Sequence, residues 1–227
     1  MDVHSVSSVS AKSLPALPLA KPPQIIPEGS LAELGRAAAD CRACPLWRTA
    51  TQVVFGEGPA SAELMLIGEQ PGSVEDLKGR PFVGPAGRLL EQALAAAGLD
   101  RGALYLTNAV KHFKYEPRGK VRLHKRASAA EQAACRRWLA AELLRVRPRL
   151  VVGLGAMAAL ALFGSAFRLT RERGEWRALA GGARGLATWH PSALLRMPDQ
   201  ARRHAAYGEL VADLRRVAAA LAGDGGK

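Results

Sequence analysis

The stretch GEQPGSVEDLKGRPFVGPAG, which runs from Gly68 to Gly87, is the part of the sequence that decides the fold. It follows an apolar run, Leu64–Ile67, whose length predicts a buried strand. The residues after it, 88–94, place apolar side chains at helical spacing. The order strand, glycine- and proline-rich loop, helix is typical of an open α/β sheet, in which ligand-binding loops gather at the carboxyl ends of strands.

The side chains of this loop suit a flat polar heterocycle. Phe82 offers a ring face for stacking, Gln70 offers an amide for the polar edge of a base, and Glu69 and Asp76 add carboxylates. The loop lacks both GxGxxG and Gly-Lys-Ser/Thr, so it is neither a dinucleotide fingerprint nor a P-loop. By itself such a loop also suits phosphate binding or a simple turn.

Size and composition predict one domain. A chain of 227 residues with 48% hydrophobic content can build one good core. Residues 1–30 are rich in Ser, Pro and Ala without a sustained period, which predicts a disordered tail, and residues 223–227 predict a flexible end. We find no secretory signal pattern and no stretch near the ~18 apolar residues of a membrane helix. We therefore expect a cytoplasmic protein that does not enter membranes.

The charge is concentrated in one segment. The net charge is +12, and between Arg101 and Arg149 thirteen Lys and Arg residues stand against three Glu residues, a balance of +10. Such a segment predicts a polyanionic partner, with DNA or RNA ahead of a membrane surface. The alternative is a solvated basic face without a partner.

Three cysteines indicate a metal or cluster site. Cys41 and Cys44 form a CxxC pair, and Cys135 is the third cysteine of the chain. A thioredoxin-like redox role is disfavoured because no strand precedes the pair. A metal site therefore needs a fourth ligand of another kind.

Strands and helices alternate along the rest of the chain. Residues 104–107 and 186–189 predict strands that end at Asn108 and His190, and residues 150–154 predict another. Between them, 111–126 is a basic loop with two histidines, too long and polar for a simple turn. The alternation predicts a single three-layer α/β/α domain with a four-stranded parallel sheet, so the polar strand ends should converge on one crevice.

Several motifs together resemble the uracil-DNA glycosylase superfamily, in its iron-sulfur branch. The motifs are GEQPG with PFVGPAG, TNAVKH, and HPSALLR, and the resemblance covers residues 31–222. Within that branch the sequence is most similar to UdgX, a relative of the family-four enzymes. Gln70 stands where family four usually has alanine, His112 stands where it has cysteine, and the run KVRLH, residues 120–124, is similar to the UdgX loop Lys-Arg-Arg-Ile-His.

The resemblance implies an activity and a cofactor. The protein would excise uracil from DNA, with single strands preferred, release free uracil, act as a monomer and become cross-linked to the abasic site through His124. A four-iron, four-sulfur cluster would be held by Cys41, Cys44, His112 and Cys135. From the residues alone, a zinc site with three Cys and one His is equally allowed, and a buried Cys135 with His112 as a DNA contact is a further alternative.

The resemblance also implies roles for individual residues. The catalytic set would be His124, Glu69, His190 and Asp76. The substrate set would be Gly68, Gln70, Phe82, Asn108 and His190. The DNA-binding set would be Lys120, Arg122, Lys125, Arg126, Ser192 and Arg196. Two alternatives remain: a hydrolytic family-four enzyme in which His124 only contacts DNA, and a noncatalytic iron-sulfur protein that binds nucleic acid.

Overall fold

A computed structural model describes residues 8–10 and 16–223. Its central sheet has the strand order β4-β3-β7-β9-β8. The strands are β3 (Leu64–Gly68), β4 (Tyr105–Asn108), β7 (Leu150–Leu154), β8 (Arg177–Ala178) and β9 (Arg184–Thr188). The first four in spatial order are parallel, and β8 pairs antiparallel with β9 at the edge. The predicted fold is confirmed, with one short strand added because the segment before β9 folds back on it.

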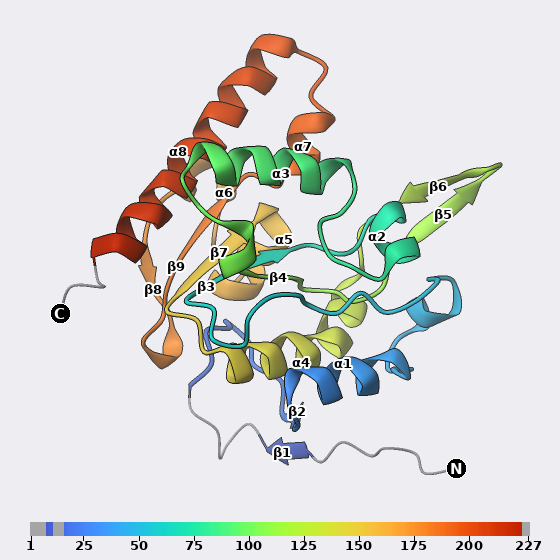
Figure 1. Cartoon of the computed structure of the whole chain (residues 1–227). Helices are drawn as coiled ribbons and strands as arrows, with labels where there is room; N and C mark the ends of the chain where they lie inside the picture. Colours follow the sequence, from blue (N-terminus) through green and yellow to red (C-terminus); the bar gives the residue numbers. More distant parts are fainter. Residues whose placement is uncertain (1–7, 11–15, 224–227) are drawn as a thin grey trace.

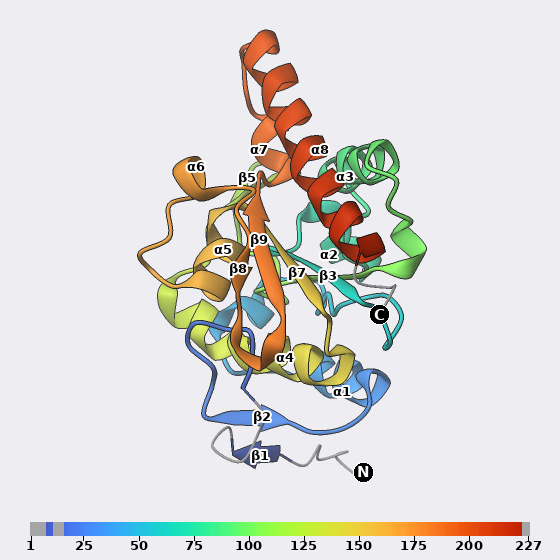
Figure 2. The same cartoon turned by 90° about the vertical axis from the view of Figure 1, so that its left-hand side faces the viewer.

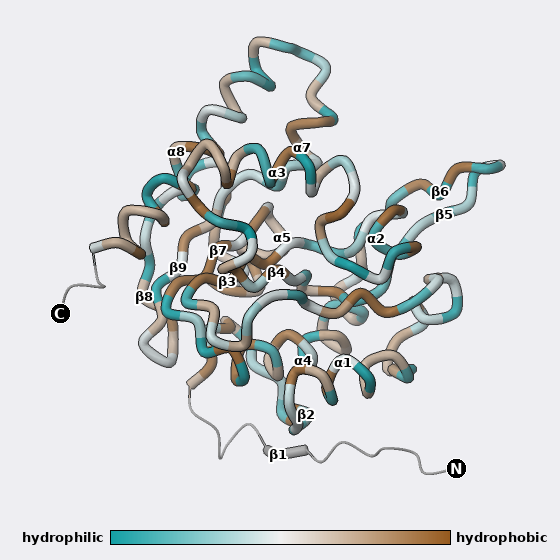
Figure 3. The backbone as a smooth tube through the Cα atoms, viewed as in Figure 1, coloured by the Kyte–Doolittle hydropathy of each residue, from teal (hydrophilic) through white to brown (hydrophobic). Residues whose placement is uncertain are grey.

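Helices cover both faces of the sheet (Figure 1). One face carries α3 (Pro85–Ala96), α7 (Pro191–Leu195) and α8 (Gln200–Gly223), and the other carries α1 (Leu31–Ala39), α4 (Ala129–Val146) and α5 (Gly155–Phe163). Strand β3 serves both layers, because Leu64 and Leu66 pack on the first face and Met65 and Ile67 on the second. Each such buried side chain contributes roughly 1.5–3 kcal/mol. Figure 3 shows this as hydrophobic colour concentrated on the central strands.

The helix starts follow the sequence signals. Ser30 and Ser128 each form a complete capping box, with Glu33 and Glu131 respectively. Asp199 accepts a hydrogen bond from the backbone N–H of Arg202 and so caps α8. Each of these helices therefore begins at a residue whose side chain caps it.

Smaller elements connect the layers. They are β1 (Ser8–Ser10), β2 (Ile25–Pro27), η2 (Pro45–Arg48), α2 (Ser73–Lys78), η3 (Arg101–Ala103), β5 (Tyr115–Arg118), β6 (Val121–His124), α6 (Leu169–Glu172) and η4 (Ala180–Gly182). Helix α2 lies inside the stretch that was predicted to be all loop. Its first turn holds Glu75 and Asp76, whose carboxylates favour the positive end of a helix.

The predicted basic loop is a β-hairpin. Strands β5 and β6 pair antiparallel, with Tyr115 opposite His124, and the two-residue turn between them begins at Gly119, whose φ is 58°. The hairpin projects from the body of the protein (Figure 1). In the paired strands the backbone N–H and C=O groups form hydrogen bonds with each other, whereas in a solvated loop they would form them with water. The pairing also fixes the position of His124.

The N-terminal segment differs from its predicted disorder. In residues 16–30 the side chains of Leu17, Leu19 and Ile26 are buried in the core that includes α4. Figure 2 shows β2 running beside α4. Their burial could not be predicted from the sequence, because the apolar residues of this segment have no regular period. The tail prediction for residues 1–7 and 11–15, and the flexible end over 224–227, lie outside the described residues.

The length and the polarity of a helix decide whether it could cross a membrane. Within residues 8–10 and 16–223, every helix is too short or too polar to span a bilayer.

Candidate active site and cysteine pocket

A pocket of about 990 Å³, open to solvent on one side, lies at the carboxyl ends of the parallel strands. The loop after β3, the end of β4 and the segment after β9 all contribute to it, as the strand order predicts. Its walls include Gln70, Phe82, Asn108, His124, His190, Ser192, Leu195 and Arg196. Residues from four separate parts of the sequence thus share one cavity.

Gly68 allows the base-sized part of this pocket to form. A Cβ atom at Gly68 would lie 2.3 Å from Oδ1 of Asn108 and 2.6 Å from the Phe82 ring, both closer than atoms can approach. Phe82 is itself in the left-handed region, with φ 54°, and its ring is 6.1 Å from the His190 ring between centroids. A flat ring placed here would meet an aromatic face and an amide edge at once.

His190 is held as a neutral ring with a defined tautomer. Its Nδ1 accepts the backbone N–H of Ser192 at 3.1 Å, so the proton of the neutral ring is on Nε2. The Ser192 hydroxyl lies 2.7 Å from the same nitrogen. Burial, with Arg196 and His124 adding to it, lowers the pKa of His190 to about 4. Near neutral pH His190 therefore offers one N–H donor without carrying a charge.

Arg122 and Asp76 anchor the hairpin to α2. The Asp76 carboxylate is fully buried and pairs with the Arg122 guanidinium at 2.6 Å. It also accepts the backbone N–H and the hydroxyl of Thr51, at 2.9 and 2.6 Å. Arg122 donates further to the Ser73 carbonyl and stacks over Tyr115. Both oxygens of Asp76 are thus occupied, so the structure assigns these two residues to anchoring the hairpin, in place of the predicted contacts with substrate and phosphate.

Gln70 holds the base of the same hairpin. Its Nε2 donates to the carbonyls of Lys114 and Lys125, at 3.2 and 3.0 Å, which lie at the two ends of the hairpin. Its Oε1 is buried and has no hydrogen-bond partner among the described residues. The side chain as a whole lines the pocket, so Gln70 contributes both to the pocket wall and to the support of the hairpin.

His124 ends β6 and lines the pocket from the hairpin side. Its ring lies 6.0 Å from the Phe113 ring, although much of the side chain remains exposed. Partial loss of water lowers the pKa of His124, the Glu69 carboxylate raises it, and Arg196 lowers it again, with the balance downward. Glu69 is therefore close enough to influence His124, although it is absent from the pocket wall.

The remaining predicted DNA-binding cations lie on the hairpin, just after it and after α7, and of these only Arg196 lines the pocket. Lys120 lies at the hairpin turn, and Lys120, Arg126 and Arg196 are exposed. Lys125 makes an exposed ion pair with Glu116 at 2.6 Å, which solvent screening makes weak. The contacts of these cations with phosphates remain a prediction.

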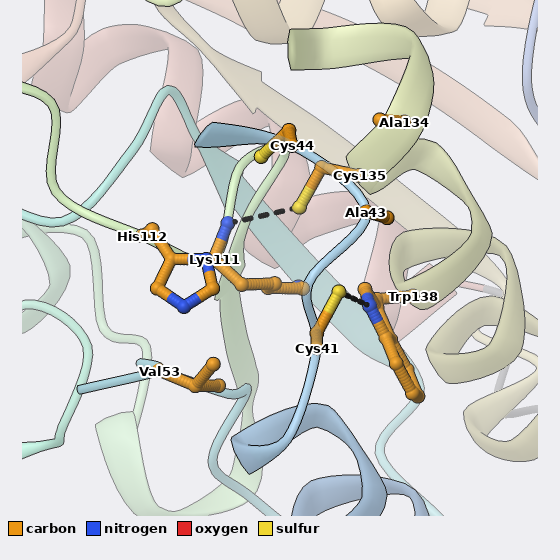
Figure 4. A pocket seen from close by; sticks show the side chains of 9 residues that line it. All are labelled: Cys41, Ala43, Cys44, Val53, Lys111, His112, Ala134, Cys135 and Trp138. Atoms are coloured by element: carbon orange, nitrogen blue, oxygen red, sulfur yellow. Dashed lines mark hydrogen bonds between the residues drawn. The ribbon is translucent and has the colours of Figure 1, made fainter. Parts of the chain in front are cut away.

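A second, smaller pocket gathers the predicted metal ligands. Cys41, Cys44, His112 and Cys135 line one narrow pocket, together with Lys111 and others (Figure 4). Within the described part of the chain, no three His, Cys, Asp or Glu side chains converge tightly enough to hold a single metal ion. The ligands are brought to one pocket, then, but are spread over its walls.

The sulfur atoms of this pocket accept N–H groups. The Trp138 indole donates to Cys41 and the Lys111 backbone donates to Cys135, each at 3.2 Å (Figure 4). Burial raises the pKa of Cys135 to about 12, so the thiol without a metal stays protonated. The N–H donors act in the opposite direction, because they stabilise the negative charge that a metal-bound sulfur carries.

A buried ion pair between the two pockets was not predicted. The Lys111 ammonium pairs with Glu142 at 2.5 Å, and both side chains are at most 1% exposed. Lys111 also donates to the Asn108 carbonyl at 2.8 Å, and Glu142 accepts from the Gly56 backbone. In the sequence, Lys111 is one cation among many and Glu142 is one helical acid, so no local signal marks the pair.

Replacing Lys111 by methionine should destabilise the protein by about 3–5 kcal/mol, because Glu142 would be left buried without a counter-charge. The free energy of unfolding in denaturant would measure this. In the double variant Lys111→Met/Glu142→Gln the buried charge is gone and the Gly56 contact is kept, so more than half of the loss should be recovered. A single-variant loss below about 1 kcal/mol would contradict the assignment.

Fold and site together define the class of this chain: an α/β/α protein with a pocket at the strand ends that is lined by an aromatic ring, two amides and two histidines. Comparison of sequences supplies the family. The family described as the Uracil DNA glycosylase superfamily matches residues 55–215, and the chain belongs to it.

Three relatives are Type-4 uracil-DNA glycosylases. The protein from Thermotoga maritima is 40% identical over 158 residues, which cover 69% of this chain and 78% of the relative. That from Archaeoglobus fulgidus is 35% identical over 177 residues, with 75% and 85% covered. That from Pyrobaculum aerophilum is 34% identical over 175 residues, with 74% and 86% covered. The family and these relatives support excision of uracil from DNA.

Proposed function

We propose that this chain excises uracil from DNA, with single strands preferred, and that His124 then captures the abasic sugar covalently, as the resemblance to UdgX implies. Membership of the superfamily supports the excision. The observation that carries the capture is that His124 shares a pocket wall with His190, on a hairpin tied down by Asp76.

Base recognition would use the loop after β3 and the end of β4. The uracil would leave the stack and enter the pocket, where Phe82 stacks on its ring. Asn108 would pair with its polar edge through both donor and acceptor. Gln70 would add a contact to the base, and its place in the pocket wall supports this role in addition to its structural one.

Bond cleavage would be assisted by His190. As the bond between C1′ and the base nitrogen breaks, its electron pair stays on uracil, and negative charge develops on a ring oxygen. The Nε2–H of neutral His190 would donate to that oxygen. The sugar left behind is an oxocarbenium-like cation that must gain a nucleophile.

Capture would use the lone pair of an unprotonated nitrogen of His124, which forms a bond to C1′. The ring then carries the positive charge and loses its remaining N–H proton to Glu69 or to water. The lowered pKa of His124 supports this role, because the nucleophile must be neutral. A hydrolytic reaction, with His124 as a DNA contact, is the second candidate and is favoured by the Type-4 relatives.

A denaturing gel tests the proposal. The protein is mixed with a labelled single-stranded oligonucleotide that contains one uracil, with and without heating before the gel. We expect a slow band that survives heat, with no more than one uracil released per protein molecule. Free abasic product formed over many turnovers would contradict covalent capture and would support the hydrolytic reaction. No uracil release at all would contradict both reactions.

The rate of adduct formation should depend on pH in a defined direction. A neutral His124 is required, and its pKa lies below the ordinary value of 6.5. The rate should therefore fall on acidification, with the midpoint of the fall below pH 6.5. Single-turnover rates between about pH 5 and 8 would measure this. A decline centred at or above 6.5 would show that His124 titrates as an unperturbed histidine or that another group limits the rate.

We also propose that the cysteine pocket holds a four-iron, four-sulfur cluster, whose part is structural. A zinc ion needs all its ligand atoms within about 2.0–2.3 Å. A cluster binds each ligand through a different iron, which is compatible with ligands spread over the pocket walls. Cys41, Cys44, His112 and Cys135 would be the ligands.

Iron and acid-labile sulfide analysis of anaerobically purified protein should find about four of each per chain, with visible absorption typical of such clusters. In Cys135→Ser, which removes a buried ligand, the iron content should fall by more than half. Ala133→Ser, at an exposed position on the same helix and outside the pocket, is the matched control. One equivalent of zinc and no sulfide would overturn this assignment.

A further inference from the structure

A second groove lies beside the uracil pocket, between α3, α7 and α8. It contains about 1030 Å³, including its open side, and is lined by Leu89, Gln92, Leu195, Arg203, His204 and Tyr207, among others. The N-terminal turns of α8 project above the sheet and form one wall (Figures 1 and 2). The predicted site residues do not include any of these side chains.

The chemistry of the groove suits a nucleotide. Leu89 and Leu195 supply apolar surface and Tyr207 supplies a flat ring, on which any base can stack. Arg203 and His204 are exposed, lie in the first turns of α8 and make no ion pair within the described part of the chain. No carboxylate is among the described residues that line the groove. A phosphate is thus offered a free guanidinium near the positive end of a helix.

The groove adjoins the uracil pocket. Leu195 lines both cavities, and Arg196, next along the chain, lines the uracil pocket. A single strand whose uracil enters the first cavity would therefore pass Leu195 with its adjacent nucleotide. Adjacent bases in an unstacked strand are separated by about the length of one side chain, so one shared residue is a sufficient boundary.

We propose that this groove is a subsite for the nucleotide next to the uracil in single-stranded DNA, with its base on Tyr207 and its phosphate at Arg203. The inference rests on the proposed excision of uracil and adds a determinant of strand binding to it. It also supplies a reason for the preference for single strands, because a base paired in a duplex is not free to leave its stack for the groove.

The test uses Arg203→Gln and Tyr207→Leu, with Arg215→Gln as the matched control. Arg215 lies on the same helix and contacts the Ala96 carbonyl, away from the groove. Three oligonucleotides carry one uracil each: one with nucleotides on both sides, one with the 5′ side removed and one with the 3′ side removed. Uracil release is followed with protein in excess, so that the half-saturating protein concentration and the saturated rate are obtained separately.

We expect each groove variant to raise the half-saturating concentration about five- to tenfold on the full oligonucleotide and to leave the saturated rate unchanged. On one truncated oligonucleotide the variants should match the unmodified protein, because the nucleotide they contact is missing. Arg215→Gln should match it throughout. Thermal unfolding of Tyr207→Leu checks that the loss of the ring leaves the fold intact. The side chain of Arg203 is exposed, so Arg203→Gln tests the groove without an effect on packing.

Two results would overturn the inference. The first is a change below twofold on the full oligonucleotide for Arg203→Gln. The second is an equal weakening on both truncated oligonucleotides, which would mean general electrostatic attraction. If the unmodified protein releases no uracil from any oligonucleotide, the proposed function fails and the subsite fails with it. Uracil release that the variants leave unchanged is a different outcome, because it overturns only the subsite and leaves the proposed function standing.

Discussion

A His124→Ser variant is expected to lose the heat-stable adduct completely and to keep releasing uracil. Serine removes the imidazole nitrogen that would bond to C1′ and leaves space for a water molecule at the same wall of the pocket. Its hydroxyl is a weak nucleophile without a base to activate it. Water should then capture the sugar cation, so free abasic product accumulates beyond one equivalent of protein. The measurement is the denaturing gel together with a count of uracil released.

Val121→Ser is the matched control for His124→Ser. Val121 is 59% exposed, lies on the same strand and takes no part in the pocket, so its adduct should form as in the unmodified protein. An adduct that persists in His124→Ser would move the covalent bond to another residue. An inactive His124→Ser with intact folding would instead make His124 necessary for cleavage itself.

A His190→Ala variant is expected to release uracil about 10²–10³ times more slowly, the usual effect of removing one donor from a developing anion. The donor here is the Nε2–H. Because Nδ1 accepts the backbone N–H of Ser192, the proton of the neutral ring is on Nε2. Its effect depends on the dry surroundings that also lower the pKa of His190. Single-turnover rates at saturating protein would measure the loss, since they separate chemistry from binding.

A conservative variant distinguishes hydrogen bonding from simple packing. His190→Asn keeps an N–H donor and an acceptor for Ser192, so part of the rate should return. Thermal unfolding of both variants should stay close to that of the unmodified protein, because neither leaves a buried charge. A loss below about tenfold in His190→Ala would remove His190 from the proposed mechanism.

The layered fold could be predicted from local patterns. A run such as Leu64–Ile67 is apolar on both sides because the strand is covered on both faces, and Ser128 with Glu131 marks a helix start within four residues. The meeting of Asn108 and His190 in one pocket also followed, since parallel strands bring their carboxyl ends together. Each of these inferences needs only neighbours in sequence or one general rule of sheet topology.

The sequence by itself therefore determined the sheet, its covering helices, the capped helix starts and the residue types at the strand ends. Tertiary structure alone decided that Asp76 binds Arg122, that Gln70 supports the hairpin, that Ile26 is buried and that Lys111 pairs with Glu142. The physical reason is distance along the chain. Lys111 and Glu142 are 31 residues apart, and a charged or amide side chain carries no local sign of the partner that folding brings to it.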